Sequence, residues 1–188
     1  MELRLATRAD AAGIAEIYRP IVASTPISFE LEPPDEEEIA RRIEAITRTY
    51  PWLVCVDGGR VAGYAYGSRH RARAAYDWSV EVSAYVHQEF RQRGIGRQLY
   101  QTLFRILRAQ GYVNAYAGIA LPNAASVALH ESVGFEPVGV YRKIGYKLGA
   151  WHDVGWWQLA LSEPASEPQP PLSLEAAQTL AVWPHLPG

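Results

Sequence analysis

The chain has 188 residues, of which 48% are hydrophobic and 20% charged, so we expect one main globular domain with a substantial apolar core. The formal net charge of -2 gives no overall field that would favour nucleic acid, and no apolar run reaches the roughly 18–20 residues that a membrane-spanning helix needs. The N-terminal stretch "MELRLATRAD" lacks the apolar segment of a signal peptide, so the expected location is the cytoplasm.

Cysteine and histidine usage argues against both a disulfide framework and a metal site. Cys55 is the only cysteine, and its apolar segment "WLVCV" favours a buried strand thiol over a nucleophile. No spacing of potential ligands suggests a metal. Among the histidines, His152 is expected to be structural, and His70, His87 and His185 are expected to be solvated.

The N-terminal part of the chain predicts a short strand and two helices. "LRL" at 3–5 is typical of a strand. Thr7 and Asp10 form an approximate capping box before a helix, which Pro20 is expected to end or kink. Isoleucines recur at helical spacing over 35–48, and the acidic start of that segment suits a helix N-terminus.

The remaining elements alternate between strand and helix. "WLVCVDGGRVAGYAY" predicts an antiparallel hairpin, and "WSVEVSAYV" alternates, with Glu81 on its polar face. Further elements are a helix from Ile95 to about Gln110, a strand in "YVNAYAGIA", a helix in "LPNAASVALHESVGF", and strands in "EPVGVYRKIGYK" and "DVGWWQLAL". This order predicts a three-layer α/β domain with helices on both faces of a mixed sheet.

The segment 163–188 differs in composition from the rest of the chain. It is rich in proline, which disfavours regular structure. We expect a mobile or loosely docked tail, and the alternative is a short docked helix in "LSLEAAQTLAVW". The main domain is therefore expected to span residues 1–162.

The segment "RQRGIGRQLY", from Arg91 to Tyr100, lies between a predicted strand and a predicted helix. Its glycines permit close backbone approach, and the free amides of a helix N-terminus form an anion site. The segment lacks a full G-x-G-x-x-G fingerprint and the Lys-Ser/Thr of a P-loop. On its own it is compatible with phosphate binding or with a tight turn bearing solvated charges.

Two motifs together resemble a known family. "RQRGIG" matches the Q/R-x-x-G-x-G/A signature of the GCN5-related N-acetyltransferases, and "LPNAASVALHESVGF" matches their second motif. "YDW-x-VE" and "GYK-x-G-x-WHDVG-x-WQ" are similar to the phosphinothricin and methionine sulfoximine/sulfone acetyltransferase branch. The resemblance covers about residues 2–162 and leaves the tail outside.

The resemblance implies a splayed sheet, the acyl-CoA N-acyltransferase fold, with acetyl-CoA as co-substrate in the gap after the strand that ends at Val86. Backbone groups on this strand would pair with the pantetheine arm, and amides of the glycine segment would hold the pyrophosphate. The implied cofactor-binding residues are Ala84, Tyr85, Val86, Arg91, Gln92, Arg93, Gly94, Ile95, Gly96, Arg97 and Asn123.

Two side chains are candidates for proton transfer. The reacting amine is mostly protonated at neutral pH and must lose a proton before it attacks a thioester. The resemblance implies that Glu81 is this base, and the alternative is an exposed strand residue. Many members of the family carry a tyrosine where this chain has His130. A histidine there can protonate the leaving thiolate, or it can be a capping or core-edge residue.

The substrate candidates lie in two loops. An amino acid with a sulfone, sulfoximine or phosphinic group needs N–H donors for its carboxylate and oxo group. Arg71 is a candidate donor or an ordinary loop charge, and Trp78, Tyr146 and Trp151 are candidates for a pocket wall or a dimer interface. The implied substrate-binding residues are Phe29, Glu30, Arg73, Ala74, Ala75 and Tyr76.

The expected function is therefore acetyl transfer from acetyl-CoA to the α-amine of a small amino acid analogue. Its other partners are expected to be neither nucleic acid nor membrane, and the resemblance implies a homodimer. The alternatives are a peptide or protein N-acetyltransferase and a non-catalytic acyl-CoA-binding module. The presence of Glu81 in its expected context disfavours the module.

Overall fold

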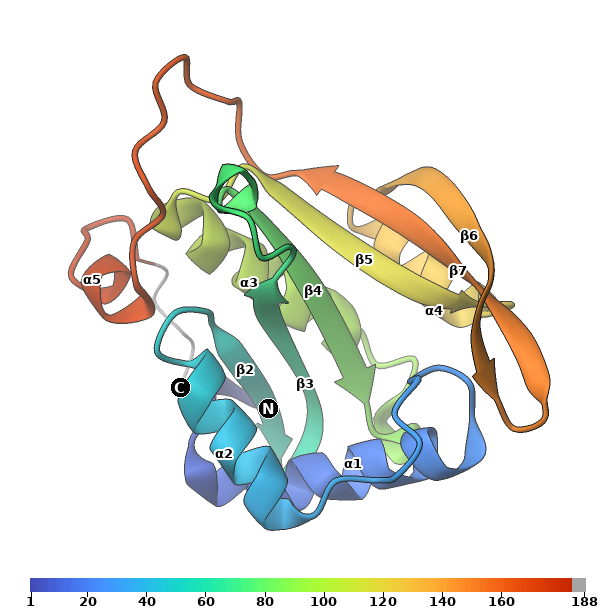
Figure 1. Ribbon diagram of the computed structural model, residues 1–188. Coiled ribbons are helices and arrows are strands. Elements are labelled where there is room, and N and C mark those ends of the chain that lie inside the picture. The colour runs from blue at the N-terminus through green and yellow to red at the C-terminus, as the bar shows by residue number, and fades with distance from the viewer. Residues whose placement is uncertain (184–188) are drawn as a thin grey trace.

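The chain folds around one open, mixed β-sheet (Figure 1), and the computed structural model describes residues 1–183. His185 lies outside the described residues. The sheet has seven strands in the order β1-β2-β3-β4-β5-β7-β6. Their bounds are Glu2–Leu5 (β1), Trp52–Asp57 (β2), Arg60–Arg69 (β3), Ser79–Val86 (β4), Asn114–Leu121 (β5), Glu136–Lys147 (β6) and Ala150–Ala160 (β7).

Helices cover both faces of this sheet. On one face, α1 and α2 pack through a buried cluster that contains Ile14 and Tyr64. On the other, α3 and α4 pack through a cluster that contains Leu103 and Phe135. The predicted three-layer α/β class is confirmed, because each face of the sheet buries its own apolar cluster. The helices are Ala11–Ser24 (α1), Glu36–Ile46 (α2), Ile95–Gln110 (α3), Ala124–Ser132 (α4) and Leu174–Gln178 (α5), with short 3-10 turns at Arg8–Asp10, Ala74–Tyr76 and Gln88–Phe90.

The centre of the sheet opens between β4 and β5. These two strands are parallel and pair only from Ser79–Glu81 to Asn114–Tyr116. Every other pair of neighbouring strands is antiparallel. Beyond Glu81 and Tyr116 the two strands diverge, as Figure 1 shows. The backbone groups of β4 that face β5 therefore have no ladder partner there, and the predicted splayed sheet is confirmed.

Two local features follow the sequence prediction and one departs from it. Asp10 accepts from the Thr7 backbone and hydroxyl, so the predicted capping box is present. Cys55 is buried in β2, where burial raises the pKa of its thiol. Of the two predicted effects of Pro20 on α1, termination is contradicted, since the helix continues to Ser24. Burial of Val22 against the core sustains the last turn beyond the exposed proline.

The described part of the tail returns to α3. The Trp78 indole N–H donates to the Gln169 carbonyl at 2.8 Å, and Gln110 donates from its side chain to the Leu172 carbonyl at 2.9 Å. Leu174 and Ala177 of α5 are buried. Within the described residues, which end at Trp183, the tail therefore contains the short docked helix that was the alternative to a mobile tail.

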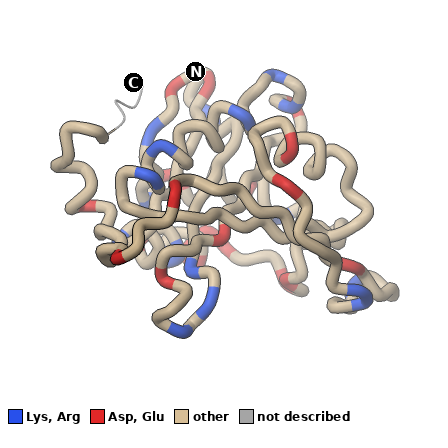
Figure 2. The backbone as a smooth tube through the Cα atoms, turned by 90° about the horizontal axis from the view of Figure 1, so that it is seen from above, with Lys and Arg blue, Asp and Glu red and all other residues tan. Residues whose placement is uncertain are grey.

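Charged side chains of both signs are interspersed along the backbone (Figure 2), in keeping with the net charge of -2. None of the helices within residues 1–183 combines the length and apolar character that crossing a membrane demands.

Candidate active site

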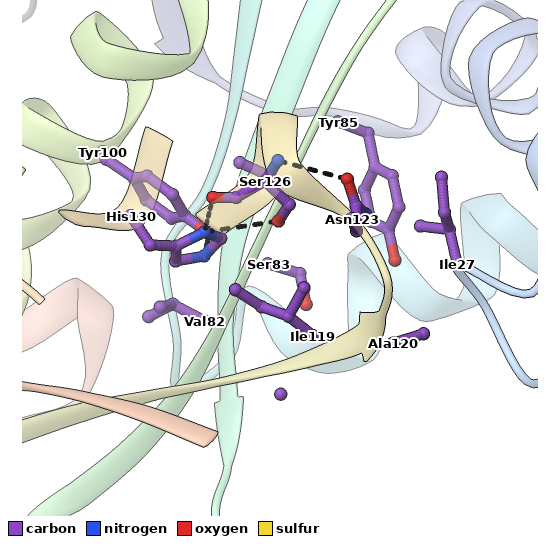
Figure 3. Close-up of a pocket in the computed structure, with 12 residues that line it drawn as sticks. Ile27, Val82, Ser83, Tyr85, Tyr100, Ile119, Ala120, Asn123, Ser126 and His130 are labelled. Carbon is purple, nitrogen blue, oxygen red and sulfur yellow. Dashed lines mark hydrogen bonds between the residues drawn. The ribbon is translucent and has the colours of Figure 1, made fainter. Parts of the chain in front are cut away.

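A pocket lies where β4 and β5 diverge (Figure 3). Its walls come from the unpaired part of β4, the facing part of β5, α4 with its N-cap residue, Tyr100 of α3 and one loop residue. Tyr100 of α3 and His130 of α4 lie side by side in it. The lining residues are Ile27, Val82, Ser83, Ala84, Tyr85, Tyr100, Gly118, Ile119, Ala120, Asn123, Ser126 and His130.

The glycine segment forms the turn that opens α3. Gly94 is the N-cap residue, with φ 77° and no side-chain cap, so the first-turn amides have no capping side chain. A Cβ at Gly94 would meet nothing within 4 Å. A Cβ at Gly96 would lie 2.9 Å from Leu129 Cδ2 of α4. The first glycine therefore permits the left-handed turn and an open approach, whereas the second permits close packing of α3 on α4.

The side chains of this turn have different surroundings. Ile95 is buried in the core, so only its backbone is available. Arg93 lies over the Phe90 ring at 5.1 Å, and Arg97 donates to the Ser132 carbonyl at 2.9 Å. Arg91 and Gln92 are exposed, and Gln92 has a positive φ of 61°. The turn thus presents backbone amides and exposed cationic side chains on one side.

The remaining predicted cofactor residues lie around the pocket. Ala84 and Tyr85 line it, whereas Val86 packs against the apolar core cluster. Asn123 lines it as the N-cap residue of α4, where its Oδ1 accepts from the Ser126 amide at 3.2 Å. The Asn123 carboxamide oxygen is therefore already used to cap the helix.

Glu81 occupies the last β4 position that pairs with β5, opposite Tyr116. Its Oε1 lies 3.0 Å from His70 Nδ1 and 3.5 Å from an Arg71 guanidinium nitrogen. The side chain is 31% exposed. The expectation of a solvated His70 is wrong, because its side chain is only 12% exposed and contacts this carboxylate. Glu81 is therefore one member of a polar cluster at the point where β4 and β5 stop pairing.

His130 is buried beside Tyr100. Its Nδ1 donates to the Ser126 carbonyl at 2.7 Å, so in the neutral ring Nε2 accepts from the Tyr100 hydroxyl at 2.8 Å. Burial lowers the pKa of His130, and the hydrogen bond to Ser126 opposes this only in part. Burial raises the pKa of the Tyr100 hydroxyl. At neutral pH the pair therefore consists of a neutral imidazole and a protonated phenol.

The carboxylate of the predicted substrate residue Glu30 is hydrogen-bonded within the protein. Its carboxylate accepts two hydrogen bonds from Arg42, at 2.7 and 3.1 Å, and one from the Tyr18 hydroxyl at 2.9 Å. Burial disfavours the charged form, yet the bonds from Arg42 and Tyr18 lower the pKa of Glu30 overall. Both oxygens are engaged within the protein, the side chain is 35% exposed, and the substrate-binding role of Glu30 stays a prediction.

A buried lysine holds the same loop against β6. The Lys147 ammonium donates to the Val22 carbonyl at 2.6 Å and to the Ser28 carbonyl at 2.7 Å. Phe29 lies directly over the backbone of Gly145. His152 Nε2 donates to the Lys147 carbonyl at 3.0 Å, so the predicted structural role of His152 is confirmed. Lys147 is the lysine of the motif "GYK-x-G-x-WHDVG-x-WQ", but its sequence context predicts no contact for it.

The second predicted substrate loop is exposed. Arg73 precedes the short 3-10 turn of Ala74, Ala75 and Tyr76, none of which is buried. The Tyr76 ring lies 6.1 Å from the His70 ring, at the edge of the Glu81 cluster. Trp78 does not line the described pocket, and its indole N–H donates to the Gln169 carbonyl of the tail.

Several site residues gave no signal in the sequence. Tyr100 lies one position after Leu99 on the buried stripe of α3, where a tyrosine resembles any core aromatic. Tyr116 and Trp156 reach the cluster through the β5–β7 pairing, which brings Tyr116 next to Gln158 and Gly118 next to Trp156. Only the strand order places them beside Glu81. His87, also expected to be solvated, is buried against the Phe90 ring.

Known proteins match this chain over most of its length. Residues 3–156 match the family described as "Acetyltransferase (GNAT) domain". The chain is 41% identical over 165 residues to a phosphinothricin N-acetyltransferase of Streptomyces viridochromogenes, covering 88% of this chain and 90% of that protein. It is 36% identical over 167 residues to an L-methionine sulfoximine/L-methionine sulfone acetyltransferase of Salmonella typhimurium, covering 88% and 98%.

A solved structure matches the fold. The crystal structure of a GNAT superfamily phosphinothricin acetyltransferase from Sinorhizobium meliloti, in complex with AcCoA, has a TM-score of 0.83 at 37% identity, covering 92% of this chain and 97% of that one. The predicted resemblance and enzyme class are thus confirmed, since family match, relatives and fold agree. The chain belongs to the GNAT acetyltransferase family, as an N-acetyltransferase of the amino-acid type.

Proposed function

We propose that this protein transfers the acetyl group of acetyl-CoA to the α-amine of a small amino acid analogue of the phosphinothricin, methionine sulfoximine or methionine sulfone type. The observation that carries the proposal is the position of Glu81. This carboxylate lies at the last paired residue of β4, where the sheet opens next to the pocket. The names of the Streptomyces and Salmonella relatives support the substrate class.

The residues present fit acetyl-CoA, which supplies the acetyl group as a thioester. The β4 backbone beyond Glu81 has unpaired groups facing the gap, and these suit an extended amide-bearing arm. Backbone groups of Ala84 to Val86 would hold that arm, and amides of Gln92 to Arg97 would hold the pyrophosphate, with Arg91 adding charge. The open space at Gly94 supports this assignment. Asn123 would contact the arm through its side-chain N–H groups.

Glu81 is the proposed general base. It takes one proton from the substrate ammonium, and the amine nitrogen then forms a bond to the acetyl carbon. As the amide forms, the carbon–sulfur bond breaks and its electron pair leaves with sulfur. The nitrogen loses its second proton to solvent in the same step, and the thiolate takes up a proton from solvent to leave as the CoA thiol. A backbone N–H on the open part of β4 would stabilise the oxygen on which negative charge develops.

The sequence leaves His130 open between a proton donor for the leaving thiolate and a capping or core-edge residue, and its contacts favour the second. Its ring is neutral at pH 7, and its one N–H bonds the Ser126 carbonyl. A thiolate with a conjugate pKa of about 8.5 leaves with little help from an acid. We assign His130 the role of holding the Tyr100 hydroxyl in the pocket wall.

His130→Phe is expected to act mainly on stability. It leaves the buried Tyr100 hydroxyl without its acceptor, which costs about 1–3 kcal/mol of unfolding free energy. The folded-state pKa of His130 is lowered, so wild-type stability falls as pH drops below about 6.5, where the unfolded chain binds more protons. In the variant, the unfolding free energy should no longer fall with pH for this reason. Urea unfolding at a series of pH values from 5 to 8 measures this pH dependence. A large fall in kcat at unchanged stability would instead support a donor role.

For the substrate, the exposed arginines near Glu81 are the proposed anion ligands. Arg71 lies over the Trp156 ring at 5.7 Å and reaches the cluster, and Arg73 lies in the adjacent loop. The Tyr76 ring packs against the His70 ring in the same cluster. Phe29 packs against the His152 ring of β7. Guanidinium groups suit both a carboxylate and a phosphinic or sulfone oxygen.

The test is a free-thiol assay with acetyl-CoA and a panel of amines. We expect CoA release with phosphinothricin, methionine sulfoximine or methionine sulfone, and background release with a peptide bearing a free N-terminus. Background release with all three small amines overturns the proposal. Release with the peptide alone favours the protein N-acetyltransferase, and acetyl-CoA binding without any release favours the non-catalytic module.

The proposed assembly is a homodimer that pairs through the β6–β7 hairpin. Tyr146 and Trp151 are 58% and 61% exposed, with ring centroids 5.4 Å apart. A contiguous exposed apolar patch marks an interaction surface. The exposed apolar side chains of the hairpin are Val138, Val140, Tyr141, Ile144, Tyr146, Leu148 and Trp151.

Trp151→Asp is expected to convert the dimer to a monomer, because a charge would be desolvated in the interface. Size-exclusion chromatography with light scattering measures the mass. Val182→Asp is the matched control, since Val182 is 71% exposed and lies outside the hairpin. The control is expected to stay dimeric. A monomeric wild type contradicts this assembly.

A further inference from the structure

His70 is placed against Glu81 by the β3–β4 ladder. Ser68 pairs with Glu81 across this ladder, and His70 follows two residues later. His70 lies just beyond the end of β3 at Arg69, and its side chain reaches Glu81 from there. Its Nδ1 lies 3.0 Å from Glu81 Oε1, a normal hydrogen-bond distance.

Aromatic rings fix the orientation of the His70 imidazole. It stacks on Tyr116 with centroids 4.6 Å apart and planes 15° apart. Tyr76 and Trp156 meet it edge-on, each with its ring centroid 6.1 Å away. Tyr116 is also the β5 partner of Glu81 at the last paired position before the strands diverge. These rings therefore hold the imidazole beside Glu81, at the point where β4 and β5 stop pairing.

Two donors compete for Glu81, and the geometry favours His70. The Arg71 contact to the same oxygen is longer, at 3.5 Å, and its side chain is 43% exposed. The His70 side chain is 12% exposed and has a ring stacked on one face. A short, shielded bond from a rigid ring restricts a carboxylate more than a bond from a mobile guanidinium.

We infer that His70 is the positioning residue of the base. Its Nδ1–H donates to Glu81 and turns the carboxylate so that it accepts the proton of the substrate ammonium. The inference rests on the proposed function and adds a residue to it. An ionised carboxylate only accepts hydrogen bonds, so the neutral ring must carry its proton on Nδ1. One proton of the substrate ammonium ends on Glu81, and the nitrogen loses its second proton to solvent as the amide forms. The electron pair of the broken carbon–sulfur bond ends on sulfur, which takes up a proton from solvent.

Kinetics of two variants test this role. His70→Phe keeps an aromatic ring on Tyr116 but removes the donor, and we expect kcat to fall about ten- to hundredfold with the KM for acetyl-CoA unchanged. His70→Asn keeps an N–H near the Nδ1 position and should recover most of that loss. With Glu81→Gln, the loss from His70→Phe should largely disappear, because the two residues act as a unit. Full activity of His70→Phe, or additive losses in the double variant, overturns the inference.

Nitrogen-15 NMR of histidine-labelled protein in alkaline buffer gives a readout that needs no turnover. The His70 signals, identified by their absence in His70→Phe, should show the Nδ1–H tautomer in the wild type and the Nε2–H tautomer in Glu81→Ala. An Nε2–H ring in the wild type overturns the inference whatever the activity. If the wild type shows the Nδ1–H tautomer but no amine gives CoA release, the proposed function is wrong, whereas the hydrogen bond from His70 to Glu81 is supported.

Discussion

Glu81→Gln is expected to lower kcat/KM for the amine by about a hundred- to ten-thousandfold, because an amide of the same shape cannot take the substrate proton. The carboxylate is 31% exposed and held by His70 and Arg71, so removing its charge should leave the fold intact. Steady-state CoA release measures the effect. The KM for acetyl-CoA should stay within about threefold, because the cofactor residues lie beyond Glu81 on β4 and at the glycine turn.

The control for this variant is Glu44→Gln. Glu44 is 51% exposed on α2 and pairs with Arg8, outside the cleft. Exposed ion pairs contribute little to stability, so this change should leave both kinetic constants as they are. If Glu81→Gln keeps wild-type activity across the pH range, Glu81 is not the base.

The second large effect is expected from Gly94→Val, which should raise the Kd for acetyl-CoA about tenfold or more. Gly94 has φ 77°, a conformation that costs other residues about 1–2 kcal/mol and a β-branched residue more. The turn should relax and move the first amides of α3, and each lost bond to a charged group is worth about 1.5–3 kcal/mol. Isothermal titration calorimetry with acetyl-CoA measures the change.

Gly59→Val separates backbone strain from cofactor binding. Gly59 has φ 80°, and a Cβ there would also meet nothing within 4 Å, but this glycine lies in the β2–β3 hairpin. The two variants should lose similar amounts of unfolding free energy. Only Gly94→Val should weaken acetyl-CoA binding, and equal affinity in both variants would remove the pyrophosphate assignment from this turn.

Gly94 and Gly96, in the turn that begins α3, differ in how far the sequence predicts their roles. Spacing alone leaves an anion-binding turn and a tight turn with solvated charges both open, and Gly94 in the left-handed region is compatible with either. Gly96 has a different reason, the approach of Leu129 from α4. That contact joins residues far apart in the chain, so no local pattern reports it. The same limit applies to Glu30, whose carboxylate bonds Arg42 across the α1–α2 connection.

The sequence by itself determined the element order, the capping at Thr7 and the buried thiol of Cys55, because these depend on periodicity and on neighbours a few residues apart. Its two motifs also determined the family. Tertiary structure alone decided the partners of the functional groups. His70 was expected to be solvated, but in the fold it contacts Glu81. His130 is a neutral ring that accepts a hydrogen bond from Tyr100. Protonation and orientation depend on burial and on contacts across strands, and only the folded sheet creates these.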